Sequence, residues 1–278
     1  MSTENLERMK RVLVHILLLF GVLVSIFPFY WLIVMATNST EDVFAYPPKL
    51  AFGGELWNNV QRVFEAIPFW SSLWNTVVVA VATTVLMMFF SSLAAFAFAK
   101  FEFPGKKPLF VMLLATLMVP SQLAVVPQFI IMANLGWAGT LQALIVPGLV
   151  SAFGIFLIRQ YAENAVPRDL LDSARIDGCG FMRQYWNVAV PLLRPVLAFL
   201  GIFTFITAWN DYLWPLVIMI NPDQVTLQVA LAQLEGIQGF DYSLVMTGTL
   251  LAVIPLIVVF LFGARQFLAD LAAGALKQ

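Results

Sequence analysis

The fold is decided first by residues 12–36, which read VLVHILLLFGVLVSIFPFYWLIVMA. This stretch has no Lys, Arg, Asp or Glu, and about 20 apolar residues are enough for a helix to cross the hydrocarbon core of a bilayer. It is longer than the apolar part of a signal peptide, ends in aromatic residues, and is not followed by a small-residue cleavage pattern. We therefore predict a membrane-anchoring helix over residues 12–36.

The same pattern recurs along the chain. Residues 66–99 and 108–158 are also free of charged side chains, and the second stretch is long enough for two spans with a turn at Gly136 and Gly139. The predicted transmembrane helices are residues 12–36, 75–99, 109–131, 141–159, 196–220 and 242–263. The sequence thus predicts an all-α polytopic membrane protein with six transmembrane helices in a single transmembrane domain over residues 1–278.

Composition excludes several classes of protein. Of the 278 residues, 61% are hydrophobic and 11% charged, whereas soluble domains carry about 25% charged residues. The net charge of -1 gives no overall positive field for a nucleic acid. One cysteine and one histidine cannot form a disulfide framework or a Cys/His metal site within the chain. We predict no catalytic residue and no metal ligand.

The distribution of positive charge predicts the orientation. Of the 15 Lys and Arg residues, all but Lys49 and Arg62 lie in the N-terminal end, in the loop after the second predicted helix, at the end of the fourth helix or in the loop after it, or in the tail over residues 264–278. Cytoplasmic loops are enriched in Lys and Arg. Both termini are therefore predicted to be cytoplasmic.

The cytoplasmic loop over residues 160–195 is too rich in helix signals to be a simple connector. Pro167 suits the first turn of a helix, apolar residues share one face over residues 168–176, and Asp177-Gly178 ends that helix. A second helix is predicted from Phe181. A short amphipathic helix of this kind suits docking into the groove of a partner, and the alternative is a helix that lies among the lipid headgroups.

This loop resembles the EAA loop of ATP-binding-cassette (ABC) importer permeases, in which Glu-Ala-Ala is followed by a glycine and a closing Ile-x-Leu-Pro. The residues at matching positions are Asp172, Ser173, Ala174, Gly178, Val188, Val190 and Pro191. Residues 99–106, 156–160 and 209–215 resemble the carbohydrate branch of the family, and the tail resembles the shorter six-helix permease of maltose-type importers. Asp172 and Ser173 depart from the usual Glu and Ala, and Cys179 stands where Ala or Gly is usual.

The resemblance implies a transport subunit rather than an enzyme. Residues 104–107 (PGKK) lack the loop and hydroxyl of a phosphate-binding P-loop, so the chain is expected to bind no cofactor, and ATP and Mg²⁺ would be used by a dimeric ABC ATPase. The other implied partners are a second homologous permease chain, an extracytoplasmic substrate-binding protein, a carbohydrate substrate and the cytoplasmic membrane of a prokaryote. The residues implied in ATPase coupling are Asp172, Ser173, Ala174, Arg175, Asp177, Gly178 and Pro191.

Three polar residues are candidates for the translocation pathway. Asp211 is a carboxylate inside an apolar run, and ionisable groups within membrane segments are costly and often functional. Asn210 and Gln122 share this interpretation. The alternative is an interfacial packing role, because Asp211 falls near the outer end of its predicted helix among aromatic residues.

Two other functions remain open from the sequence. One is an ABC permease for a solute that is not a carbohydrate, since the substrate cannot be read from these motifs. The other is a self-sufficient secondary transporter, which should show charged or broken helices in matching halves. Because Asp211 is the only carboxylate within the predicted spans, coupling to an ion gradient is disfavoured. An intramembrane protease is disfavoured because no pair of aspartates lies in the predicted spans.

Overall fold

The computed structural model describes residues 3–237 and 241–275, and the side chains of residues 7–222, 224–235 and 241–261. Within these ranges every regular element is a helix. Five helices are long and apolar enough to cross a membrane, and a sixth candidate is a helix pair bent in its middle. The prediction of an all-α polytopic membrane protein is therefore confirmed.

The chain divides into two compact units. One unit contains the chain up to Pro68 together with Leu231–Ile254, and the other contains Phe69–Ala230 together with the chain from Pro255. The first unit is built from α1 (Thr3–Thr37), α2 (Thr40–Phe44), α3 (Leu56–Ala66), the end of α13 (Leu227–Ile237) and the first part of α14 (Tyr242–Ala275).

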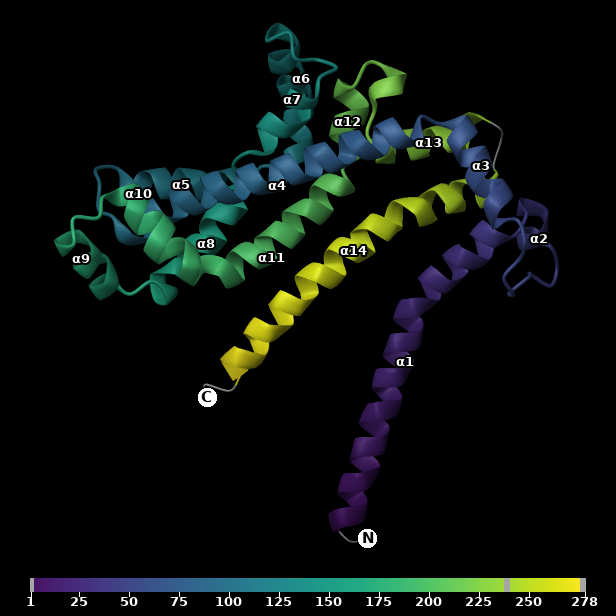
Figure 1. The fold of residues 1–278 in the computed structure, drawn as a ribbon, viewed down its shortest axis with the longest axis horizontal. Coiled ribbons are helices and arrows are strands. Elements are labelled where there is room, and N and C mark those ends of the chain that lie inside the picture. Colours follow the sequence, from purple (N-terminus) through teal and green to yellow (C-terminus); the bar gives the residue numbers. More distant parts are fainter. Residues whose placement is uncertain (1–2, 238–240, 276–278) are drawn as a thin grey trace. The chain divides into compact units, whose positions relative to one another are not determined.

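The second unit is organised around three helices that lie side by side, namely α4, α8 and α11 (Figure 1). Phe96 of α4, Ile158 of α8 and Leu193 of α11 are each fully buried in a shared apolar core. The elements are α4 (Phe69–Lys100), α5 (Lys106–Thr116), η1 (Ser121–Ala124), α6 (Val125–Asn134), α7 (Leu141–Ile145), η2 (Val146–Gly148), α8 (Ala152–Ala165), α9 (Arg168–Ile176), α10 (Phe181–Gln184), the π-helical turn η3 (Tyr185–Ala189), α11 (Val190–Trp209), α12 (Leu213–Ile218) and η4 (Pro222–Gln224).

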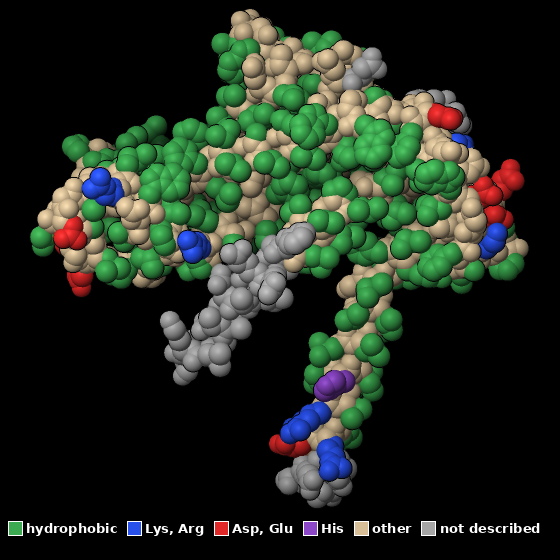
Figure 2. Space-filling model, in the orientation of Figure 1, with side chains coloured by type: hydrophobic (Ala, Val, Ile, Leu, Met, Phe, Trp, Pro, Cys, Tyr) green, Lys and Arg blue, Asp and Glu red, His purple; other side chains and the backbone are tan. Residues whose placement is uncertain are grey.

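Hydrophobic side chains remain exposed along the long helices. In α1 the side chains of Leu17, Leu19 and Phe20 are each more than half exposed, and Figure 2 shows hydrophobic atoms along the middle of this helix, with the histidine and charged side chains toward its N-terminal end. A helix that is apolar on all sides is stable when lipid or another apolar partner surrounds it. This surface is what a membrane-spanning helix requires.

The helix predicted over residues 109–131 is broken in the structure. Its two parts, α5 and the η1–α6 segment, are bent by 93° at the break. The end of α5 tightens into three-residue turns, in which the Met118 N–H donates to the Ala115 carbonyl and the Val119 N–H to the Thr116 carbonyl. Pro120 then has no N–H with which to continue the helix. The span predicted as one helix therefore consists of two shorter helical segments.

The helix predicted over residues 196–220 is also different in the structure. It begins earlier, as α11 at Val190, and it stops at Trp209 before a short α12 resumes at Leu213. The Asn210 side-chain amide donates to the Ile206 carbonyl at 2.9 Å, and the backbone N–H of Trp214 donates to the Asp211 carboxylate. Asn and Asp side chains compete with the helical hydrogen-bond pattern in this way.

Of the other four predicted spans, one is interrupted and three differ only in their bounds. The predicted span over residues 141–159 consists of α7, η2 and α8 and extends to Ala165, with an interruption before Ser151, whose hydroxyl accepts from the Gly154 N–H at 3.0 Å and caps α8. The helices predicted over 12–36 and 75–99 are longer, as α1 and α4. The span over 242–263 continues as α14 through most of the predicted tail. Residues 276–278 of that tail lie outside the described residues.

In the first unit, buried polar side chains fasten α3 to the end of α1. Asn59 on α3 is 2% exposed, and its amide donates to the carbonyls of Ala36 and Asn38 at 3.0 and 3.2 Å. The Gly53 N–H donates to the Thr37 hydroxyl at 3.1 Å. The segment between α1 and α3 is thus folded by hydrogen bonds to the last turn of α1.

Asp241 links three elements of the same unit. Its carboxylate accepts from the Thr40 hydroxyl of α2 at 2.6 Å, from the Arg62 guanidinium of α3 at 2.5 Å and from the Leu244 N–H of α14 at 3.1 Å. Burial raises the pKa of Asp241, but the hydrogen bonds from Thr40, Arg62 and Leu244 outweigh it and hold this pKa below its usual value. The ionised carboxylate therefore stabilises the packing of α2, α3 and α14 in this unit.

The pH dependence of stability should reveal this role. A carboxyl group whose folded pKa is lowered contributes stability above its unfolded pKa of about 3.9, and this contribution is lost as the pH falls through the folded value. We expect Asp241→Asn to lower the melting temperature in lipid nanodiscs by about 2–6 °C at pH 7. We also expect its melting temperature to fall less than that of the unaltered protein below about pH 4.

The matched control is Asp42→Asn, because Asp42 has an exposed carboxylate that pairs with Lys49 at 3.2 Å. Exposed ion pairs contribute little to stability, so this variant should melt close to the unaltered protein. Equal melting temperatures for the Asp241 and Asp42 variants at pH 7 would contradict the structural role of Asp241.

Candidate functional site

The helix predicted over residues 168–176 is present as α9 with the same bounds. Pro167 precedes it in an extended conformation, and Leu171, which is 2% exposed, attaches it to the core of the second unit. The rest of α9 projects polar and charged side chains outward, and Ile176 at its end is 88% exposed. An exposed apolar residue on a short, charged helix makes this a surface suited to a partner.

A Schellman motif ends α9. Gly178 has a φ of +77°, the Gly178 N–H donates to the Arg175 carbonyl at 3.0 Å, and the Cys179 N–H donates to the Ala174 carbonyl at 2.8 Å. These bonds satisfy carbonyl groups that a helix end otherwise leaves free. The left-handed conformation at Gly178 is what permits them.

The segment after α9 is tied both to the motif and to α4. The Gln184 amide donates to the Cys179 carbonyl at 2.7 Å. Tyr185, which is 2% exposed, shares a hydrogen bond of 2.7 Å with the Ser92 hydroxyl of α4. Tyr185 also begins the π-helical turn η3 that leads into α11, and π-helical turns are frequent at functional sites. Hydrogen bonds and the chain itself therefore connect the end of α9 to α11 and α4.

Six of the seven predicted coupling residues lie on α9 or in the turn that ends it. Ala174 is half-buried, and the others are exposed. The Arg175 guanidinium pairs with the Asp172 carboxylate at 3.0 Å and lies over the Phe101 ring at 5.4 Å from its centre. Pro191 lies in the first turn of α11. Contact of these residues with an ATPase remains a prediction.

The second unit also contains a cavity of about 940 Å³. It is bounded by α4, α8 and α11, by η1 and α6 directly after the first helix break, by the segment between η2 and α8, and by residues 210–212 between α11 and α12. Irregular backbone at membrane depth is tolerated where it lines a cavity rather than lipid. The helix breaks and the cavity therefore belong to one structural feature, which we call the central cavity.

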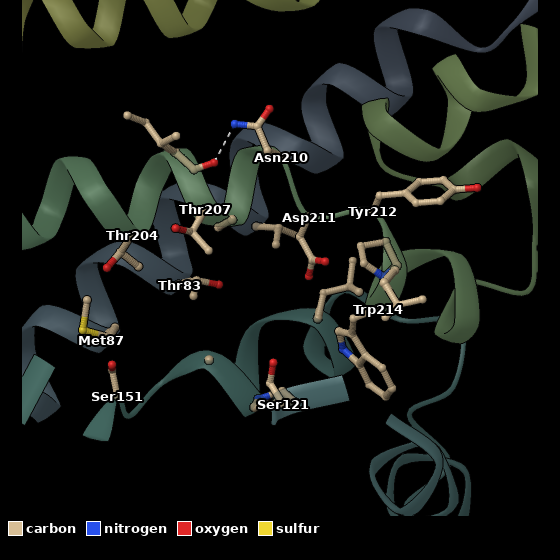
Figure 3. A pocket seen from close by; sticks show the side chains of 18 of the residues that line it. Thr83, Met87, Ser121, Ser151, Thr204, Thr207, Asn210, Asp211, Tyr212 and Trp214 are labelled. Carbon is tan, nitrogen blue, oxygen red and sulfur yellow. Dashed lines mark hydrogen bonds between the residues drawn. The ribbon is translucent and has the colours of Figure 1, made fainter. Parts of the chain in front are cut away.

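Polar side chains converge on the central cavity from several elements. Figure 3 shows the Asp211 carboxylate directed into the space, with hydroxyl groups of α4, α11 and the opposite segments around it. The Ser and Thr residues of the lining are Thr83, Ser121, Ser151, Thr204 and Thr207. The rest of the lining is mostly apolar or aromatic, including Phe153, Phe203 and Trp214. Apolar walls with a few placed polar groups are typical of small-molecule sites.

All three predicted pathway residues line the central cavity, but they do so differently. Asp211 points into it, as Figure 3 shows, whereas the Asn210 amide turns back to the Ile206 carbonyl. The Asn210 side-chain oxygen also accepts from the Gln228 amide at 3.4 Å. Gln122 lines the wall next to Ser121, whose hydroxyl lies 3.5 Å from the Gln122 oxygen. The structure thus brings together residues that are far apart in the sequence.

The Ser and Thr residues of the cavity were not predicted from the sequence. Thr204, Thr207 and Asp211 are spaced by three and four positions, which places them on one face of a helix. That spacing is the signal that could have singled out Thr204 and Thr207. Ser121 and Ser151 carry no such signal, because they adjoin helix breaks that only the structure shows.

Residues 88–269, more than half of the chain, match the family described as "binding-protein-dependent transport system inner membrane component". The chain belongs to this family. Membership confirms the resemblance to ABC-importer permeases and identifies the protein as a multi-pass membrane permease subunit of that transport family.

Full-length relatives agree with this assignment. The lactose transport system permease protein of Rhizobium radiobacter is 33% identical over 96% of this chain and 97% of its own. An arabinooligosaccharides transport system permease protein of Halalkalibacterium halodurans is 32% identical over 91% and 92% of the two chains. The sn-glycerol-3-phosphate transport system permease protein of Yersinia pestis is 35% identical over 92% and 94%.

The fold is also that of a solved importer. A chain in the crystal structure of a bacterial ABC transporter for the acidic polysaccharide alginate superimposes with a TM-score of 0.82 at 22% identity, covering 96% of this chain and 99% of that chain. A chain of an alginate transporter bound to a periplasmic protein that holds an alginate pentasaccharide gives a TM-score of 0.64 at 13% identity, over 92% and 94%. These likenesses establish the permease fold.

Proposed function

We propose that this chain is a membrane-spanning permease subunit of an ABC importer and that the central cavity is its part of the pathway for a sugar or oligosaccharide. The observation that carries the proposal is the cavity itself, where five Ser and Thr hydroxyl groups and the Asp211 carboxylate lie among mostly apolar walls. Saccharides present hydroxyl groups and apolar ring faces, so this lining matches their chemistry. Relatives named for lactose and arabinooligosaccharides support the substrate class.

The partners in the proposal follow from the family. A dimeric ABC ATPase would use ATP and Mg²⁺ and would contact α9 through residues such as Asp172, Arg175 and Gly178. A second homologous permease would complete the pathway, and an extracytoplasmic binding protein would deliver the sugar. The chain would lie in the cytoplasmic membrane of a prokaryote with both termini in the cytoplasm. Closure of the ATPase would then move α9, η3 and α11 together and open the cavity to alternate sides.

The test is to purify the tagged chain from its host in mild detergent, identify the co-purifying polypeptides, and reconstitute the complex in proteoliposomes. We expect a second permease and an ATPase to co-purify. Uptake of a neutral oligosaccharide should require both ATP and the binding protein.

Two controls make the outcome decisive. Removal of the ATPase should abolish accumulation, and an empty vesicle should show none. Recovery of the chain alone, with sugar uptake that needs an ion gradient and no ATP, would replace the importer with a secondary transporter. ATP-dependent uptake of an amino acid or peptide, without uptake of any saccharide, would retain the importer but overturn the substrate class.

A further inference from the structure

The described lining of the central cavity carries a negative charge and no positive charge. Among the described residues that line it, the only Asp, Glu, Lys or Arg is Asp211, and no histidine is present. The carboxylate points into the space (Figure 3). It accepts a hydrogen bond from the backbone N–H of Trp214, which is a neutral donor. Since the described lining contains no cationic side chain, none of its residues cancels the negative charge.

An anionic saccharide would meet this charge without compensation. Carboxylate and phosphate groups are normally bound by Arg or Lys, often through paired hydrogen bonds, and this lining supplies neither residue. Two like charges about 10 Å apart in a partly wet cavity repel each other measurably, because the effective dielectric constant is well below that of bulk water. A neutral sugar avoids this repulsion and can donate its hydroxyl protons to the carboxylate.

From this lining we infer that Asp211 is a specificity-determining residue that makes the cavity select neutral saccharides against acidic ones. The inference rests on the proposed function and narrows its substrate class. By this inference, the substrate of this chain is neutral, whereas the relative named for sn-glycerol-3-phosphate and the structural neighbour named for alginate are each named for an anionic substrate. The position of Asp211 at the break between α11 and α12 gives its carboxylate direct access to whatever passes through the cavity.

The first measurement detects the field of Asp211 without any sugar. Ser121 lines the same cavity, and Ser121→Cys in a Cys179→Ser background places one reactive thiol there. In the assembled complex, that thiol is allowed to react with a cationic reagent (trimethylammonium-ethyl methanethiosulfonate) and with an anionic one (sulfonatoethyl methanethiosulfonate). The ratio of the two rates reports the local potential, because the fraction of thiolate cancels.

We expect Asp211→Asn to lower this cationic-to-anionic rate ratio by about tenfold, since the loss of one charge acts in opposite directions on the two reagents. The matched control is Glu102→Gln, which removes an exposed carboxylate outside the cavity lining and should change the ratio less than twofold. An unchanged ratio in the Asp211 variant would overturn the inference.

The second measurement is uptake by the complete importer in proteoliposomes. The probes are lactose, arabinotriose and maltotriose, each compared with its analogue in which one primary alcohol is oxidised to a carboxylate. We expect the neutral form to be preferred, and we expect Asp211→Asn to reduce that preference by about tenfold. The binding protein is the same for both variants, so its own selectivity cancels in the comparison.

The outcomes separate this inference from the proposed function. A tenfold change in the reagent ratio with an unchanged neutral preference would overturn the role of Asp211 in selection. Uptake of no saccharide, whether neutral or acidic, would contradict the proposed function, and the reagent ratio alone would then decide whether the cavity has the negative field. Changes in both measurements would support the inference.

Discussion

Replacing Gly178 with valine should reduce ATP-driven uptake by about tenfold. Gly178 has a φ of +77°, and a left-handed conformation costs an ordinary L-residue about 1–2 kcal/mol, with β-branched residues disfavoured most. A Cβ atom at this position would meet nothing within 4 Å, so the cost arises in the backbone and not in packing. The expected result is a frayed end of α9 and loss of the hydrogen bond from the Cys179 N–H to the Ala174 carbonyl.

Two further variants isolate this cause. Gly178→Asn should retain most of the uptake, because asparagine tolerates the left-handed region. Gly180→Val should retain it as well, because Gly180 has a φ of -71° and open space around it. Uptake and ATP hydrolysis are measured on the same reconstituted complexes, so that a loss of coupling is distinguished from a loss of assembly. Full uptake by the Gly178→Val protein would remove α9 from the coupling route.

Replacing Gly53 with alanine should destabilise the first unit through a steric clash with the end of α1. A Cβ atom at Gly53 would lie 2.2 Å from the Thr37 carbonyl oxygen and 2.4 Å from the Asn38 side-chain oxygen. The Thr37 carbonyl cannot simply move away, because it belongs to the last turn of α1 and accepts from the Glu55 N–H at 2.9 Å. Overpacking of this kind costs about 1–3 kcal/mol and occasionally more.

The expected result is a melting temperature in nanodiscs lowered by about 4–10 °C, together with faster proteolysis between residues 38 and 68. Gly54→Ala is the matched control, since a Cβ atom at Gly54 would meet nothing within 4 Å. If the Gly53 and Gly54 variants melted at the same temperature, the contact between this segment and the end of α1 would have to be abandoned.

Local signals were sufficient to predict where the long apolar helices lie and where α9 begins and ends. The apolar stretches of about 20 residues predicted where helices lie because burial in lipid requires nothing from the rest of the fold. The bounds of α9 were predicted correctly because Pro167 and Gly178, which start and stop it, act through their own backbone restrictions. The resemblance to the EAA loop added the family, which the match over residues 88–269 confirmed.

The helix breaks could not be predicted in the same way. A proline precedes the break at η1, yet Pro28, Pro195 and Pro255 lie inside the continuous helices α1, α11 and α14. Proline removes one hydrogen-bond donor wherever it occurs, and the surrounding structure decides whether the helix continues or turns. The break at residues 210–212 has no proline at all and depends on the Asn210 and Asp211 side chains.

By itself, the sequence determined where the long apolar stretches lie, the bounds of α9 and the presence of Asp211 in an apolar run. The tertiary structure alone decided that α5–α6, α7–α8 and α11–α12 are interrupted around one cavity and that hydroxyl groups from separate helices face Asp211 there. The physical reason is that hydrophobicity and backbone restrictions act locally, whereas a free backbone group or a polar side chain in a membrane protein is tolerated only where other segments supply a cavity or a partner.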